Sequence, residues 1–246
     1  MKQKRTAYFM AAFFLTVLWG LVAWATALPI IPSPLAVLER LYDVLDLIAL
    51  HGAYSLWRIV AGLGLAVIIG YPLGLVIGYF PRVERILSPV VYLSYPVPKI
   101  ALLPILMLLT GVGETAKIGM IFLIILFQVV IAVRDGIHSI KPEYYYPLYT
   151  LGAGFGDVCR EVLLPASLPH FLTAVRVAMA TAISVLFFTE TFGTEYGMGF
   201  FIMDAWLRVN YLDMYAGIVV LSLLGLTLFT VLDWAESRLC RWQNKK

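Results

Sequence analysis

Residues 141–169 read KPEYYYPLYTLGAGFGDVCREVLLPASLP and interrupt an otherwise strongly apolar chain. The stretch combines charged and polar side chains with glycines and prolines, which are typical of turns between regular elements. A chain that is apolar on both sides of such a stretch leaves the bilayer there. The sequence therefore predicts a polar hairpin between two membrane-spanning segments.

Within the hairpin the residue types predict a helix, a turn and a second helix. The first helix is expected to begin at 145–146, because Pro147 is tolerated in the first turn, where amides have no helical partner. A glycine turn over 152–156 follows. The second helix is expected from about Asp157 to Leu164, with Asp157 as its cap.

The composition indicates a membrane protein before any motif is considered. Of the 246 residues, 61% are hydrophobic and 13% are charged, and the mean hydropathy is +0.89. Soluble domains are less apolar and more charged. The length suffices for about six spans of roughly 20 residues within one membrane domain. A net charge of +3 without a long basic run argues against nucleic-acid binding.

Apolar stretches long enough to cross a bilayer recur along the chain, and Lys and Arg collect in the loops on its cytoplasmic side. We place the spans at about 7–28, 54–79, 86–109, 116–134, 171–192 and 214–233. With the N-terminus inside, the cytoplasmic Lys and Arg are Lys2, Lys4, Arg5, Arg82, Arg85, Arg134, Lys141, Arg160, Arg238, Arg241, Lys245 and Lys246. At or beyond the outer face lie Arg40, Arg58, Lys117 and Arg208. Both termini are therefore expected in the cytoplasm.

The first span has a feature of a secretory signal, because basic residues 2–5 precede it and Ala25-Thr-Ala27 resembles a cleavage site. Its apolar run is longer than the roughly 7–15 residues of a signal core, so we interpret it as an uncleaved anchor. Residues 29–52 are expected to form an outer connector that contains an amphipathic helix from about Leu35 to Leu50.

Small residues recur at a spacing of four in the second span: Gly62, Ala66, Gly70, Gly74 and Gly78. Small residues let helices approach closely in lipid, where no hydrophobic drive brings them together. This face is therefore expected to pack against protein. Internal bundle packing is favoured over a subunit interface, and both alternatives remain open.

The third span contains an unusual segment, because residues 95–104 bring Pro96, Pro98 and Pro104 together with Lys99. A regular helix is not expected there. Non-helical backbone at membrane depth is tolerated where it is buried in protein or lines a cavity, so the segment indicates a transport pathway. A membrane-embedded lysine needs a partner or water, and Glu190 is a candidate partner. Lys99 is either a structural or snorkelling cation or lies beside the path of an anionic solute; Pro96, Pro98, Lys99 and Glu190 are the pathway candidates.

Several chemistries lack their motifs in this sequence. A phosphate-binding loop ends in Gly-Lys-Ser/Thr, but no lysine here follows a glycine. Gly-x-Ser-x-Gly and His-Glu-x-x-His are also absent. The histidines fall in separate connectors, and Cys159 and Cys240 have neither metal-ligand spacing nor a disulfide framework. We therefore predict no catalytic residue, no metal site and no cofactor bound by this chain.

The third span and two later segments carry a family resemblance. Residues 96–104 (PVPKIALLP) with 111–117 (GVGETAK) resemble permeases of the nitrate, sulfonate and taurine family of ABC importers. The spacing from Gly152 to Val162 and on to Leu164 and Pro165 resembles the cytoplasmic coupling loop of such permeases. Glu190 followed by Gly-Met-Gly at 197–199 is similar to the same family. The resemblance covers roughly residues 50–238.

The hairpin departs from the family at one place. Where the family's loop reads Glu-Ala-Ala, this chain has Tyr146, Pro147 and Leu148. The usual carboxylate is therefore missing, which bears on the strength and the partner specificity of ATPase docking. The coupling residues that the resemblance implies are Tyr146, Pro147, Leu148, Gly152, Ala153, Val162, Leu164 and Pro165.

The resemblance implies an all-α integral membrane protein of about six spans, a type I (MetI-like) importer permease bundle with cytoplasmic coupling helices. The expected divisions are an N-terminal span with its connector over 1–50, a permease domain over 51–238 and a basic cytoplasmic tail over 239–246. The implied location is the prokaryotic cytoplasmic membrane.

The implied function is import of a small solute, in which closure of partner ATPases drives alternating access. The implied partners are a second permease copy, two cytoplasmic ABC ATPases that bind ATP and magnesium, an extracytoplasmic solute-binding protein and membrane lipid. Lys99 favours an anion such as a sulfonate, taurine or nitrate. Alternatives are a thiamine- or riboflavin-type vitamin precursor as solute, an ion-coupled secondary carrier, and a membrane scaffold without transport.

Overall fold

The computed structural model describes residues 2–94 and 96–240, with side chains from residue 10 onward. Tyr95 and the tail from residue 241, which includes Arg241, Lys245 and Lys246, lie outside the described residues, as do the side chains of residues 2–9. The described part is helical and contains no β-strand. It divides into two compact units, one of residues 2–55 with 194–224 and one of residues 56–94 and 96–193 with 225–240.

The first unit is built from the N-terminal helices and a later helical hairpin. It contains α1 Lys2–Thr26, α2 Pro34–Asp43, the first part of α3 Leu45–Tyr79, α10 Met198–Leu207 and the first part of α11 Tyr211–Leu239. Helix α2 begins after Ser33, whose hydroxyl accepts from the Ala36 amide at 3.3 Å. Its buried core includes Val37, Ile48 and Phe201.

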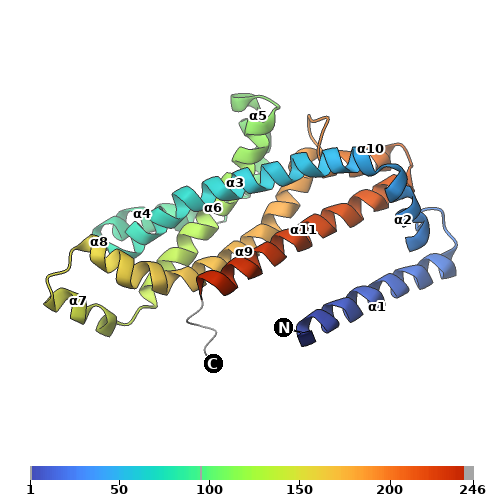
Figure 1. Ribbon diagram of the computed structural model, residues 1–246. Coiled ribbons are helices and arrows are strands. Elements are labelled where there is room, and N and C mark those ends of the chain that lie inside the picture. The colour runs from blue at the N-terminus through green and yellow to red at the C-terminus, as the bar shows by residue number, and fades with distance from the viewer. Residues whose placement is uncertain (1, 95, 241–246) are drawn as a thin grey trace. The chain divides into compact units, whose positions relative to one another are not determined.

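The second unit holds the segments that carry the sequence motifs (Figure 1). Besides the remainders of α3 and α11, it contains α4 Pro81–Ser94, η1 Lys99–Leu102, α5 Leu103–Thr110, α6 Glu114–His138, η2 Pro142–Tyr144, α7 Tyr146–Thr150, α8 Phe155–Val158, η3 Cys159–Leu163 and α9 Leu164–Glu190. Helices α6 and α9 pack along one another. Each carries a row of buried apolar residues, such as Ile125 and Val129 on α6 and Ala178 and Ala182 on α9.

The glycine stripe of α3 lies against α6. A Cβ added at Gly62 would lie 2.7 Å from the Cβ of Ile121, and a Cβ added at Gly74 would lie 2.7 Å from the Cβ of Val133. The stripe therefore mediates packing within the bundle, the first of the two alternatives that the sequence left open, because only a residue without a side chain fits so close to α6.

By length and composition, the described chain has four helices able to cross a membrane: Leu45–Tyr79, Glu114–His138, Phe155–Glu190 and Tyr211–Leu239. The pair Pro81–Ser94 and Lys99–Thr110, bent by 84°, makes a fifth if it counts as one span. The first expected span is a helix, and within it residues 10–26 form a shorter apolar segment.

Two expected helix boundaries were wrong. The amphipathic helix expected from Leu35 to Leu50 is divided at Val44, where the backbone leaves helical geometry and its amide bonds the Arg40 carbonyl at 3.2 Å. The second span therefore begins at Leu45 rather than near residue 54. No proline stands between Pro34 and Pro72 to end a helix in between.

The second hairpin helix and the fifth span were expected as separate elements, but they form one continuous helical segment from Phe155 to Glu190. A π-helical turn, Cys159–Leu163, precedes Pro165, and such a wider turn accommodates a proline that cannot donate its amide. Helix α10 was not predicted, because its ten residues are too few to be recognised as a membrane span.

Candidate functional site

The hairpin between α6 and α9 starts with a one-turn helix that a glycine ends. Pro147 lies in the first turn of α7, as its missing amide requires. Gly152 has φ +70° and donates to the Tyr149 carbonyl at 3.1 Å, while the Ala153 amide donates to the Leu148 carbonyl at 3.0 Å. This pair of bonds forms a Schellman motif, which needs a left-handed residue at the position of Gly152. No described atom beyond its chain neighbours lies within 4 Å of a Cβ added there, so backbone freedom rather than space sets the requirement.

The second half of the hairpin is capped differently from the expectation. Asp157 is not the N-cap residue of α8; Gly154 holds that position, and Asp157 Oδ2 accepts from the Gly154 amide at 3.0 Å. The helix begins two residues earlier than predicted because the carboxylate reaches back from the third helical position, where a negative charge also favours the helix N-terminus.

Two hollows adjoin the end of the hairpin. A cavity of about 480 Å³ has Val162 and Pro165 in its lining together with residues that precede α7, among them Lys141 and Tyr144. A second hollow of about 550 Å³ includes Leu164 and Pro165 and is otherwise lined by apolar residues of α3, α9 and α11 and by Tyr71. The expected coupling residues of the second half thus lie where the hairpin meets the helical bundle.

Aromatic rings connect the hairpin to the end of α3. Tyr79 and Tyr149 place their hydroxyl oxygens 3.2 Å apart, and the ring centre of Phe155 lies 5.2 Å from that of Tyr79. Burial, with a smaller contribution from Tyr149, raises the pKa of Tyr145. Tyr146 and Leu151 remain exposed. One side of the hairpin therefore packs on the bundle, while the other side is exposed.

The broken third span has the interruption that the sequence predicted. Helix α4 ends at Ser94, and helical structure resumes with the 3₁₀ turn that begins at Lys99. Pro96 and Pro98 are exposed. Lys99 Nζ donates to the Ser94 carbonyl at 2.8 Å and lies 5.1 Å from the centre of the Phe127 ring. Lys99 thus provides a hydrogen-bond donor for a backbone carbonyl at the break.

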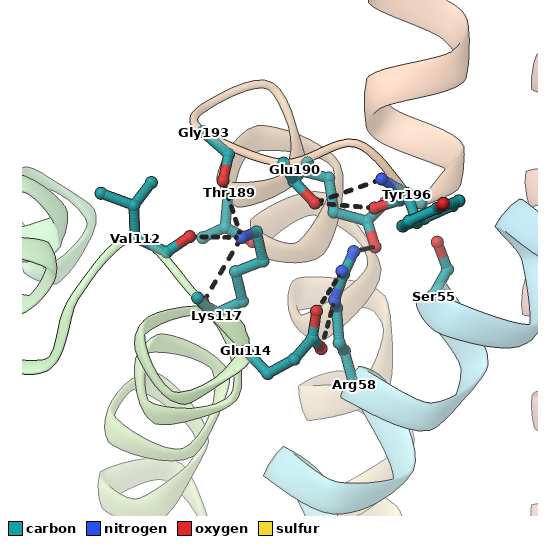
Figure 2. A network of polar contacts seen from close by, with 12 residues as sticks. Ser55, Arg58, Val112, Glu114, Lys117, Thr189, Glu190, Gly193 and Tyr196 are labelled. Carbon is teal, nitrogen blue, oxygen red and sulfur yellow. Dashed lines mark hydrogen bonds and ion pairs between the residues drawn. The ribbon is translucent and has the colours of Figure 1, made fainter.

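Glu190 has a partner other than the one expected, because the cation that the structure places against it is Arg58 rather than Lys99 (Figure 2). Arg58 Nη1 lies 2.7 Å from Glu190 Oε1, and its Nε lies 2.8 Å from Glu114 Oε2. Arg58 Nη2 also bonds Glu114, so one guanidinium holds two carboxylates on two of its edges. The side chains of Arg58 and Glu190 are 1% and 0% exposed, whereas that of Glu114 is 42% exposed.

Lys117 extends this network to two loops. Its Nζ donates to the Val112 carbonyl at 3.2 Å and to the Gly113 and Gly193 carbonyls at 3.4 Å each. Figure 2 shows the lysine between the loop that precedes α6 and the turn that follows α9. Two cations and two carboxylates thus come together with balanced formal charge, which lowers the cost of their burial.

Arg58 and Lys117 were expected at or beyond the outer face, but both side chains are buried. One signal could have found them: Arg58 is the one Asp, Glu, Lys or Arg residue between Asp46 and Arg82, and charges inside membrane segments pair with one another. Glu114 and Lys117 are three residues apart and therefore share a helix face. Among the described residues, no group of His, Cys, Asp or Glu side chains could hold a metal ion.

The chain is similar to known proteins over most of its length. The profile of a family described as "Binding-protein-dependent transport system inner membrane component" matches residues 70–242. The taurine transport system permease protein TauC of Escherichia coli is 32% identical over 242 residues, covering 95% of this chain and 88% of TauC. The formylaminopyrimidine transport permease protein ThiX of Halalkalibacterium halodurans is 30% identical over 250 residues, covering 100% of both chains. The putative aliphatic sulfonates transport permease protein SsuC of Bacillus subtilis is 27% identical, covering 87% of this chain and 79% of SsuC.

A solved structure shares the fold. A chain of the MetNI methionine ABC transporter in an inward-facing conformation matches with a TM-score of 0.67 at 20% identity. The match covers 82% of this chain and 97% of that chain.

Proposed function

We propose that this chain forms the membrane path for a small organic anion, and that a separate ATPase drives the import. The chain belongs to the family of inner membrane components of binding-protein-dependent transport systems. It is a permease subunit of an ABC importer, and its fold is that of the MetI-like type I importer permeases. The observation that carries the mechanistic proposal is the hairpin between α6 and α9, which closes on Gly152 and exposes Tyr146 and Leu151.

In the proposed complex, two copies of this permease assemble with two cytoplasmic ATPases and an extracytoplasmic binding protein. The hairpin faces the cytoplasm, as do both termini, and an ATPase binds the exposed side of the hairpin. The exposed hairpin side chains support this arrangement, as does the lack of a phosphate-binding loop in the sequence. ATP and magnesium are bound by the ATPases.

Coupling then follows from the covalent path of the chain. The hairpin joins the end of α6 directly to the start of α9, so a displacement of the hairpin acts on both helices. Nucleotide binding shifts the population between two arrangements of the bundle, because the ATPases contact the hairpin differently in each state. The broken span around Pro96, Pro98 and Lys99 supports a pathway there, since non-helical backbone at membrane depth lines cavities or is buried in protein. In this proposal Glu190 belongs to the pathway and is held in place by its ion pair with Arg58.

Two solute classes compete. TauC and SsuC carry names that specify taurine and aliphatic sulfonates, which share a negatively charged sulfonate group, and Lys99 supplies a cation at the broken span. ThiX carries a name that specifies formylaminopyrimidine and matches over the whole of both chains. We therefore propose a sulfonate-type anion first and a pyrimidine vitamin precursor second.

Reconstitution tests this proposal. The permease is placed in proteoliposomes with its ATPase, its binding protein and ATP, and uptake of labelled taurine and of labelled formylaminopyrimidine is compared. The proposal predicts ATP-dependent uptake of the sulfonate. Uptake of the pyrimidine alone would favour the second solute class, and uptake without the ATPase would favour an ion-coupled carrier and contradict the mechanism.

A further inference from the structure

The hairpin is joined covalently to α6 and α9 but not to α3. Helix α3 ends at Tyr79, and Phe80 connects it to α4, which leads into the broken span. Apart from the long chain path through α6, α5 and the broken span, a movement of the hairpin reaches α3 and α4 through packing and side-chain contacts.

An aromatic cluster supplies such a contact, and we define it as Tyr79, Phe80, Tyr145, Tyr149 and Phe155. The ring centres of Tyr79 and Phe80 lie 5.2 and 5.0 Å from that of Phe155, and that of Tyr145 lies 6.5 Å from that of Tyr79. The Tyr145 and Tyr149 rings are stacked at 6.0 Å. These separations lie in the range that aromatic pairs prefer.

Both halves of the hairpin contribute to the cluster. Tyr145 and Tyr149 precede the Gly152 turn, and Phe155 begins the helix that follows it. The end of α3 therefore contacts the hairpin on both sides of its turn. A ring cluster alone tolerates sliding, but the hydrogen bond between the Tyr79 and Tyr149 hydroxyls at 3.2 Å is directional and fixes the relative position of the two tyrosines.

We infer that Tyr79 is a positioning residue, which holds the hairpin against α3 through the Tyr149 hydroxyl and passes the movement of the hairpin to α3 and α4. This inference rests on the proposed function of the hairpin. The Tyr79–Tyr149 contact belongs to this chain's own hairpin, in which Tyr146, Pro147 and Leu148 stand where the family's loop reads Glu-Ala-Ala. Because Gly74 and Gly78 pack closely on α6, a displaced α3 is expected to move with its neighbour rather than slide past it.

The test removes a single oxygen. Tyr79→Phe keeps the ring and deletes the hydroxyl; the matched control is Tyr42→Phe on α2, which deletes the hydroxyl of an exposed tyrosine in the other compact unit. The complex with ATPase and binding protein is reconstituted, and solute-stimulated ATP hydrolysis and solute imported per ATP hydrolysed are both measured. We expect Tyr79→Phe to lower the stimulation roughly three- to tenfold, the range of one net hydrogen bond, and to lower the solute imported per ATP. Tyr42→Phe should leave both at their wild-type values.

Tyr149→Phe provides a second variant, since Tyr149 is exposed on the hairpin and the substitution keeps its ring. It should reproduce the Tyr79→Phe effect, and the double variant should be no worse than either single one, because both remove the same bond. Wild-type coupling in Tyr79→Phe and Tyr149→Phe, with loss of stimulation in Gly152→Glu, would overturn this inference and leave the proposed function standing. Wild-type stimulation in Gly152→Glu would count against the proposed function itself.

Discussion

Arg58 and Glu190 form an ion pair that is almost completely shielded from solvent, with Nη1 and Oε1 2.7 Å apart and side-chain exposures of 1% and 0%. The pair joins α3 to the last residue of α9. Burying two charges is costly, and the contact is stable only when each charge keeps its partner and its hydrogen bonds. Removing one partner of this buried pair should therefore lower the stability of the folded protein much more than removing a partner from an exposed pair.

Glu190→Gln should destabilise the complex by about 3 kcal/mol, because it leaves the Arg58 charge buried against a neutral amide. Glu114→Gln should cost about 1 kcal/mol or less, since that carboxylate is partly in solvent. The measurement is the thermal unfolding midpoint of the detergent-solubilised complex. Asp204→Asn, which breaks the exposed pair with Arg208, serves as the control and should leave the midpoint within error. Equal shifts for Glu190→Gln and Asp204→Asn would contradict the account of the buried pair.

Arg58→Lys keeps the charge but should still destabilise the protein by about 2 kcal/mol, the value of a charged hydrogen bond. A guanidinium presents separate edges to Glu114 and Glu190, whereas an ammonium is a single point that cannot span both carboxylates. Unfolding midpoints measure the effect, with Arg208→Lys as the same substitution at an exposed site. A wild-type midpoint for Arg58→Lys would mean that charge alone matters at this position.

Gly74→Ala should destabilise the bundle by about 1–3 kcal/mol, because the new methyl group would lie 2.7 Å from the Val133 Cβ and 2.9 Å from the Val130 carbonyl oxygen. Gly64 lies in the same helix, and no described atom outside its own stretch of helix is within 4 Å of an added Cβ. Gly64→Ala should therefore be neutral or stabilising by up to about 1 kcal/mol. The two variants are compared by unfolding and by the amount of assembled complex. Similar behaviour of the two would argue against close α3–α6 packing.

Gly152→Asn should keep most of the solute-stimulated ATP hydrolysis, whereas Gly152→Glu should abolish it without preventing membrane insertion. The position has φ +70°, which asparagine tolerates and most other residues adopt at a cost of about 1–2 kcal/mol. Stimulation is measured in proteoliposomes at equal amounts of inserted protein. Loss of stimulation in both variants would mean that bulk rather than backbone conformation disturbs the docked hairpin.

The sequence predicted the features that depend on long apolar runs or on proline and glycine. The helical class, the break around Pro98 and the close-packing stripe through Gly74 all follow from such local signals. The burial of Arg58 did not follow, because an arginine near the end of an apolar run looks the same whether it faces water or meets carboxylates that are distant in sequence. The continuous helix through Pro165 was missed because proline normally ends a helix, and a π-helical turn is not visible in a residue pattern.

The most direct test of the central claim is the side of the membrane that the hairpin faces and what covers it there. Leu151 is 83% exposed beside the Gly152 turn, so Leu151→Cys in a Cys159→Ser, Cys240→Ser background can be labelled with a membrane-impermeant maleimide. The account predicts no labelling in intact cells, labelling in inside-out vesicles that lack the ATPase, and protection when the ATPase is bound. Labelling from outside intact cells, or equal labelling with and without the ATPase, would contradict it.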